Sequence, residues 1–116
     1  MNIPFSPPDI TEEEIEAVAE VMRSGWITTG PKTKELERKM AEFTHTNRGV
    51  CLNSATSCME MALRLFEIGP GDEVIVPAYT YTASASVVCH VGATLRLVDV
   101  EKGTFHIDYA AVESMI

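Results

Sequence analysis

Residues 69–100, GPGDEVIVPAYTYTASASVVCHVGATLRLVDV, contain in turn an apolar run, a stretch of small residues and a second apolar run. The run at residues 74–76 is short, continuously apolar and stopped by Pro77, which is typical of a buried strand in a parallel sheet. Residues 81–91 are small and apolar enough for a buried helix, and a Gly-Ala pair then leads into a strand predicted over residues 94–100. Strands that alternate with helices predict parallel pairing through crossover helices, which is the α/β class.

A further strand, turn and helix are predicted upstream of this region. Residues 49–52 form a short apolar run, residues 53–57 a polar turn, and apolar residues then recur at helical spacing as far as Phe66. Asp108 is placed to cap one more helix. We therefore expect residues 48–116 to be the first part of a larger α/β domain.

Two amphipathic helices are predicted in residues 1–47. Thr11 and Glu14 match a capping box at the start of the first helix, and Gly25 is placed to end it. An aperiodic loop follows, and apolar residues recur again at helical spacing from Leu36 onward. Residues 1–47 are thus expected to be two N-terminal helices joined by an aperiodic loop.

The composition excludes several classes of protein. The 116 residues are 46% hydrophobic and carry a net charge of −8, with nine scattered basic residues, so neither disorder nor nucleic-acid binding is favoured. The three cysteines form no C-x-x-C pair and the three histidines have no partners at ligand spacing, so no disulfide framework and no metal site is expected. No apolar run approaches the roughly 18 residues of a membrane span. We expect a cytoplasmic protein that interacts with neither nucleic acid nor membrane.

The turn at residues 53–57, Asn-Ser-Ala-Thr-Ser, is the strongest candidate site. Small and hydroxyl residues between the carboxyl end of a strand and the start of a helix present free N–H groups and hydroxyls to an anion, which predicts a phosphate cup. The alternative is that Ser54 only caps its helix.

Two further segments carry candidate binding residues. Tyr79 and Tyr81 follow the strand at residues 74–76, at the sheet edge where α/β proteins bind ligands, and could stack on a flat cofactor. The alternative is that both tyrosines are core or interface aromatics. Trp26 lies in the aperiodic loop and could contact a ligand, or it could pack against the second helix.

Three segments together resemble the DegT/DnrJ/EryC1/StrS family of sugar aminotransferases. They are IPFSPP at residues 3–8, SGWITTGPK at residues 24–32 and GPGDEVI at residues 69–75, and the resemblance extends over residues 3–116. It implies the N-terminal part of the fold type I (aspartate aminotransferase-like) structure with a mostly parallel sheet. It also implies pyridoxal 5'-phosphate as cofactor, glutamate as amino donor, a nucleotide-linked keto sugar (4-keto pentose or hexose) as acceptor, and a homodimer.

The same resemblance assigns roles to individual residues. Ala55, Thr56 and Ser57 are implied to bind the cofactor, with Thr56 and Ser57 holding its phosphate. Many members have glycine at the position of Ala55, and the alanine found here resembles the branch that acts on 4-keto pentoses. Tyr81 is implied to stack on the pyridine ring, where the family often has tryptophan or phenylalanine. The implied substrate-binding residues form one loop: Trp26, Thr28, Thr29 and Gly30.

The resemblance also implies that the chain holds no catalytic residue. The family's Schiff-base lysine and its pyridine-nitrogen aspartate lie beyond residue 116, so we expect an incomplete chain that is inert alone. Two alternatives stay open: a sugar 3-dehydratase of the same family, with histidine in place of the lysine, and a non-enzymatic phosphate- or nucleotide-binding module. For the module we expect Val50 to pair directly with Val74, and for the enzyme we expect Val74 to pair with the strand that starts at Thr94.

Overall fold

The computed structural model describes residue 3 and residues 6–116 and divides the chain into two compact units, Met1–Cys51 and Leu52–Ile116. The family-like motif at residues 3–8 includes Pro4 and Phe5, which lie outside the described residues. The proposed functional division after residue 47 stays a prediction. Each unit is described by itself.

The first unit contains two helices, α1 (Glu12–Ser24) and α2 (Pro31–Phe43), as predicted. The capping box forms at the start of α1, because the Thr11 side chain accepts from the first turn while Glu14 accepts from the Thr11 N–H at 2.7 Å. Gly25 ends α1 with a φ of 73°, a left-handed conformation that glycine adopts without strain.

The strand predicted over residues 49–52 does not form, which corrects the sequence-based expectation. The chain here passes so close to α2 that a Cβ on Gly49 would lie 2.7 Å from the carbonyl oxygen of Glu37. The Cys51 N–H, which a strand would donate to a neighbouring strand, instead donates to Glu37 Oε1 at 3.1 Å. An apolar run becomes a strand only where another strand accepts its hydrogen bonds, and α2 takes that donor instead.

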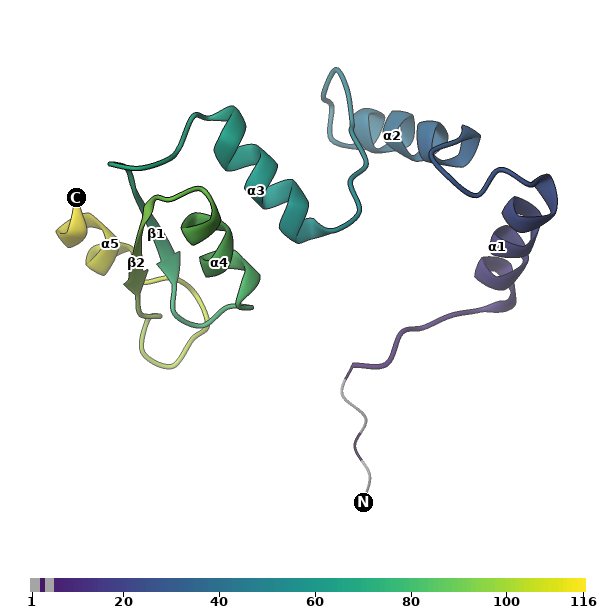
Figure 1. The fold of residues 1–116 in the computed structure, drawn as a ribbon. Coiled ribbons are helices and arrows are strands. Elements are labelled where there is room, and N and C mark those ends of the chain that lie inside the picture. Colours follow the sequence, from purple (N-terminus) through teal and green to yellow (C-terminus); the bar gives the residue numbers. More distant parts are fainter. Residues whose placement is uncertain (1–2, 4–5) are drawn as a thin grey trace. The chain divides into compact units, whose positions relative to one another are not determined.

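The second unit holds the sheet. Its elements are α3 (Ala55–Leu65), β1 (Glu73–Pro77), α4 (Ala83–His90), β2 (Thr94–Val98) and α5 (Tyr109–Met115) (Figure 1). In the part of the chain that the structure describes, β1 pairs only with β2, in parallel, with Val76 opposite Leu97. This confirms the predicted parallel pairing and the α/β class.

The core of the second unit lies between the sheet and α4. Val76, Val88, Val91 and Ala93 are buried together, and Leu63 of α3 packs against them. The predicted bounds need small corrections. The helix begins at Ala83 rather than at residue 81, because the segment before it forms a loop, and β2 ends at residue 98 rather than at residue 100, because the chain then turns into an antiparallel bridge of Val100 with Ile107.

The last helix begins where its cap was predicted. The Asp108 side chain accepts a hydrogen bond from the Ala111 N–H at 3.0 Å, which opens α5. Across the described residues, none of the helices has the length and apolar character needed to cross a membrane.

Candidate functional site

The N-terminus of α3 is an exposed helix start with a serine cap. Ser54 has extended backbone angles, and its Oγ accepts from the Ser57 N–H at 3.1 Å while donating to Ser57 Oγ at 3.0 Å. This confirms the predicted turn and the cap. The cap satisfies one of the N–H groups that a helix start leaves without an intrahelical acceptor.

The remaining donors of this turn suit an anion. The N–H groups of Ala55 and Thr56 have no acceptor among the described residues, and neither does the Thr56 hydroxyl. Thr56 and Ser57 are half-buried and Ala55 is exposed, so this turn is neither buried in the core nor fully exposed to solvent. The first turn of α3 carries no acidic residue, which leaves the positive end of the helix dipole available to a phosphate.

Residues 78–82 connect β1 to α4 and carry both candidate tyrosines. Tyr81 is 81% exposed. Tyr79 stacks on Phe105 with 4.8 Å between ring centroids and 23° between the planes. Neither tyrosine belongs to the core of this unit, and the two differ, because one face of the Tyr79 ring is covered whereas Tyr81 has no aromatic partner among the described residues.

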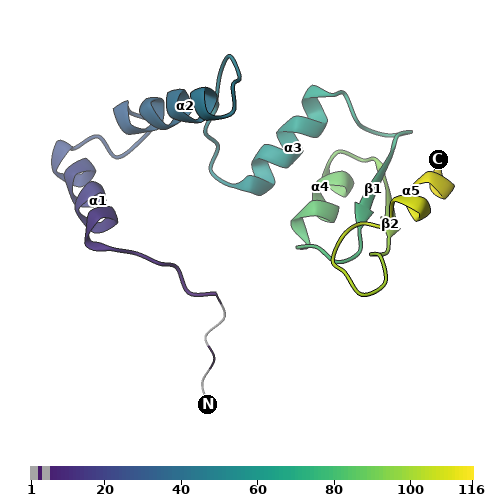
Figure 2. The same cartoon turned by 180° about the vertical axis from the view of Figure 1, so that it is seen from behind.

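The α3 start and the tyrosine loop lie toward the same side of the second unit. Helices α3 and α4 run in the same direction in two opposite views, so their N-terminal ends point the same way (Figures 1 and 2). The loop at residues 78–82 leaves the carboxyl end of β1, where parallel α/β sheets bind their ligands. Donors for a phosphate and an exposed aromatic ring thus occupy one end of this unit.

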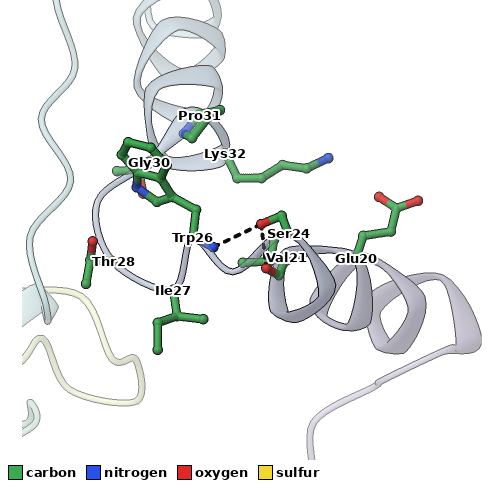
Figure 3. A pocket seen from close by; sticks show the side chains of 10 residues that line it. Glu20, Val21, Ser24, Trp26, Ile27, Thr28, Gly30, Pro31 and Lys32 are labelled. Carbon is green, nitrogen blue, oxygen red and sulfur yellow. Dashed lines mark hydrogen bonds between the residues drawn. The ribbon is translucent and has the colours of Figure 1, made fainter.

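The loop between α1 and α2 is closed on itself by Trp26 (Figure 3). The indole N–H donates to the Thr29 carbonyl at 3.0 Å, and the Trp26 backbone N–H donates to Ser24 Oγ at 3.2 Å. The ring lies over Gly30, the N-cap of α2, where a Cβ would be 2.3 Å from Trp26 Cδ1. The alternative that Trp26 packs against the second helix therefore holds at the N-cap of that helix.

A cavity of about 440 Å³ opens beside this loop within the first unit. Three of the four proposed substrate-binding residues line it, namely Trp26, Thr28 and Gly30, whereas Thr29 does not and instead supplies the carbonyl that holds the indole. Lys32 also lines the cavity and forms no ion pair with any described residue. The sequence analysis missed Lys32 as a cavity residue, although its position just after the glycine and proline that begin α2 could have indicated it.

No cluster of potential metal ligands is found in the described part of the chain. His90 does form a contact that the sequence did not indicate: its Nδ1 lies 2.9 Å from Glu60 Oε2, which links α4 to α3. The Arg64 guanidinium, and after it His90, hold the pKa of Glu60 below its ordinary value. This cluster ties the two helices together rather than forming a reactive site.

Comparison with known proteins places these features in a family. Residues 8–116 match the model of the DegT/DnrJ/EryC1/StrS aminotransferase family. Spr1654 from Streptococcus pneumoniae, described as a sugar aminotransferase and solved in apo, PMP and PLP forms, is 63% identical over 100% of this chain, with a TM-score of 0.90. An aminotransferase from Psychrobacter cryohalolentis is 34% identical over 96% of this chain, with a TM-score of 0.84.

DesV from S. venezuelae, solved in complex with a ketimine intermediate, is 38% identical over 90% of this chain, with a TM-score of 0.81. The chain spans 29% of the apo Spr1654 chain, 29% of the Psychrobacter chain and 28% of the DesV chain. These matches agree with the observed α/β fold and with the N-terminal part of aminotransferase structures.

Proposed function

Because the chain belongs to the DegT/DnrJ/EryC1/StrS aminotransferase family, we propose that it supplies the N-terminal part of a pyridoxal-phosphate-dependent sugar aminotransferase. The full-length enzyme would transfer an amino group from glutamate to a nucleotide-linked keto sugar, either a 4-keto pentose or a 4-keto hexose. The observation that carries this proposal is the capped start of α3, where Ala55 and Thr56 keep free amide donors toward the same end of the unit as the loop that carries the exposed Tyr81 (Figure 1).

The residues at the start of α3 fit the phosphate of the cofactor. The amides of Ala55 and Thr56 and the hydroxyls of Thr56 and Ser57 would donate to the phosphate oxygens, and the helix dipole would favour the negative charge. The Ser57 amide is already used by Ser54, so this residue would contribute through its hydroxyl. Tyr81, which is exposed at the same end of the unit, would cover one face of the pyridine ring.

Bound pyridoxal phosphate supplies an electron sink for carbanionic chemistry. The residues of this chain would bind and orient that group, and the family resemblance places the Schiff-base lysine at none of its four lysines. Its catalytic contribution is therefore positioning, and without the lysine the chain alone would be inactive. The choice between an aminotransferase and a 3-dehydratase depends on the residue at the lysine position, and the solved relatives described above as aminotransferases favour the first.

The loop of Trp26, Thr28, Thr29 and Gly30 is proposed to contact the sugar substrate. Its closed conformation, fixed by the bond from the indole to the Thr29 carbonyl, gives a preformed wall to the neighbouring cavity. Preformed sites bind more tightly because less freedom is lost on binding. We also propose that the full-length enzyme is a cytoplasmic homodimer, following the family.

The proposal is tested on the full-length protein. Incubation with pyridoxal phosphate, glutamate and nucleotide-linked 4-keto sugars should yield 2-oxoglutarate and amino sugar in equal amounts. Thr56→Val removes one hydroxyl donor and should weaken cofactor binding by about five- to tenfold. Thr94→Val is the matched control, since Thr94 is an exposed threonine at the amino end of β2, the opposite edge of the sheet. Absence of 2-oxoglutarate with every keto sugar, or equal cofactor affinity in both variants, would reject the proposal.

A further inference from the structure

The aromatic stack between Tyr79 and Phe105 joins two loops that leave neighbouring strands. Tyr79 follows β1 and Phe105 follows β2, and because the two strands are parallel both loops leave the same edge of the sheet. The rings lie 4.8 Å apart at their centroids and are nearly parallel. Both side chains are otherwise exposed, Tyr79 at 66% and Phe105 at 77%, so the stack is a local contact and not a part of the core.

The loop at residues 78–82 is held at both ends by hydrogen bonds, and the Tyr81 side chain takes part in none of them. At its start the Ala78 N–H donates to the Val98 carbonyl at 2.7 Å. Toward its end the Tyr81 carbonyl accepts from the Ser84 N–H at 3.0 Å, and Thr80 Oγ1 lies 3.0 Å from Ser84 Oγ. Between these anchors the stack on Tyr79 is the aromatic contact that the structure gives the loop, within the described residues. The Tyr81 backbone is thus anchored through its carbonyl, whereas its ring has no aromatic partner among the described residues, so the direction of the ring depends on how the rest of the loop is held.

The loop that carries Phe105 is internally braced. The Glu101 N–H donates to the His106 carbonyl at 2.9 Å, the Thr104 N–H donates to the Glu101 carbonyl at 3.0 Å, and the His106 N–H donates to Thr104 Oγ1 at 3.1 Å. Gly103 has a φ of 84°, which lets the chain turn tightly between these bonds. A braced loop presents the Phe105 ring in a fixed place, so the ring can restrain a neighbouring segment.

From this geometry we infer that Phe105 is a positioning residue for the cofactor site. Phe105 holds Tyr79, Tyr79 holds the loop, and the loop presents the exposed Tyr81 ring to the pyridine ring of pyridoxal phosphate. The inference rests on the proposed function and extends it to a residue that would not touch the cofactor. It also gives Tyr79 a role distinct from that of Tyr81, because the Tyr79 face that could stack on a ligand is in part occupied by Phe105.

A double-mutant cycle in the full-length protein tests the inference. Cofactor dissociation constants are measured by absorbance titration of the apoenzyme for Phe105→Ala, Tyr81→Ala and the double variant, with Phe105→Tyr to retain the ring. An aromatic pair of this kind corresponds to about a two- to tenfold change, so Phe105→Ala should raise the dissociation constant by a factor in that range. Phe105→Tyr should restore the parent value, and Phe105→Ala should have no further effect once Tyr81 is alanine.

A second measurement does not depend on the cofactor. In the apoenzyme, the amides of residues 79–82 should exchange with deuterium faster in Phe105→Ala than in the parent protein. Phe66→Ala is the matched control, because Phe66 is equally exposed at 77% and is the C-cap of α3 in the same unit; it should leave these amides unchanged. Together these results would support the inference.

Two results would overturn the inference. One is an unchanged dissociation constant in Phe105→Ala, and the other is a Phe105→Ala substitution that raises the dissociation constant by the same factor in the parent protein and in the Tyr81→Ala variant. Unchanged exchange at residues 79–82 would equally reject the restraint on the loop. Failure of the proposed function is distinguishable, since the parent protein itself would then bind no pyridoxal phosphate.

Discussion

Replacing Gly30 by alanine is expected to open the loop between α1 and α2. An alanine Cβ would lie 2.3 Å from Trp26 Cδ1 and 2.5 Å from Trp26 Nε1, far inside the roughly 3.5–4.0 Å at which carbon atoms rest in contact. The backbone at Gly30 is extended, with a φ of −139°, so the chain itself tolerates alanine. The indole must therefore move away, and its hydrogen bond to the Thr29 carbonyl is lost.

The magnitude follows from these contacts. Forcing extra atoms into a packed position costs about 1–3 kcal/mol, and the lost hydrogen bond lies within that range. Trp26 is 57% exposed and can swing into solvent, which places the cost at the lower end, about 1–2 kcal/mol. If the keto-sugar substrate needs the closed loop, its affinity should fall by at most about five- to thirtyfold.

The assay is substrate binding by calorimetry in the full-length protein. Gly25→Ala is the control in the same loop: Gly25 has a φ of 73°, and no described atom lies within 4 Å of its added Cβ, so this variant reports backbone strain without a clash. Gly30→Ala should lose its effect when Trp26 is also alanine, because nothing is left to clash. An equal loss of affinity with and without the indole would refute the reasoning.

Three further expectations can be measured on the full-length protein. Tyr81→Ala should weaken pyridoxal phosphate binding by about tenfold, whereas Tyr81→Trp should leave it unchanged and Tyr79→Ala should have a smaller effect. A larger loss for Tyr79→Ala than for Tyr81→Ala would show that the stacking role was assigned to the wrong tyrosine. Gly49→Ala should lower the free energy of unfolding by about 1–3 kcal/mol, since its Cβ would meet the Glu37 carbonyl at 2.7 Å, and an unchanged melting temperature would contradict this. The pKa of Glu60 is lowered by Arg64 and His90, so its carboxylate stabilises the fold above the ordinary glutamate pKa of about 4.3, and this contribution is lost as the pH falls through the depressed pKa. Glu60→Gln should therefore lower the free energy of unfolding at pH 7 and do so progressively less as the pH falls below about 4.3, and an effect that does not change with pH would exclude this contribution.

Much of the fold could be predicted because its signals are local. The capping box of Thr11 and Glu14 and the Asp108 cap are set by side chains within one turn of the backbone groups that they satisfy. The strand at β1 was predictable from an apolar run stopped by Pro77. The run at residues 49–52 has the same local character, but a strand also needs a partner strand. The position of α2 beside Gly49 cannot be predicted from the residues of that run.

The candidate site shows the same division. The turn at Ser54 and the loop of Trp26 were found from residue types placed at a helix start and between two helices. The stack of Phe105 on Tyr79 was missed because the two residues lie far apart in the chain and meet only through the parallel pairing of β1 with β2. Contacts of this kind need the register of the sheet, which periodicity alone does not supply.

The sequence analysis treated a helix cap and a phosphate cup as alternative interpretations of residues 53–57, and the geometry shows why they are compatible. A serine cap satisfies a single N–H group, here that of Ser57, whereas a helix start leaves several without acceptors. The cap also holds Ser57 Oγ at 3.0 Å from Ser54 Oγ, which orders the first turn while the Ala55 and Thr56 amides stay free. An anion at this position would therefore complete the hydrogen bonding that the Ser54 cap begins. The observed cap is thus no argument against a phosphate cup at residues 53–57.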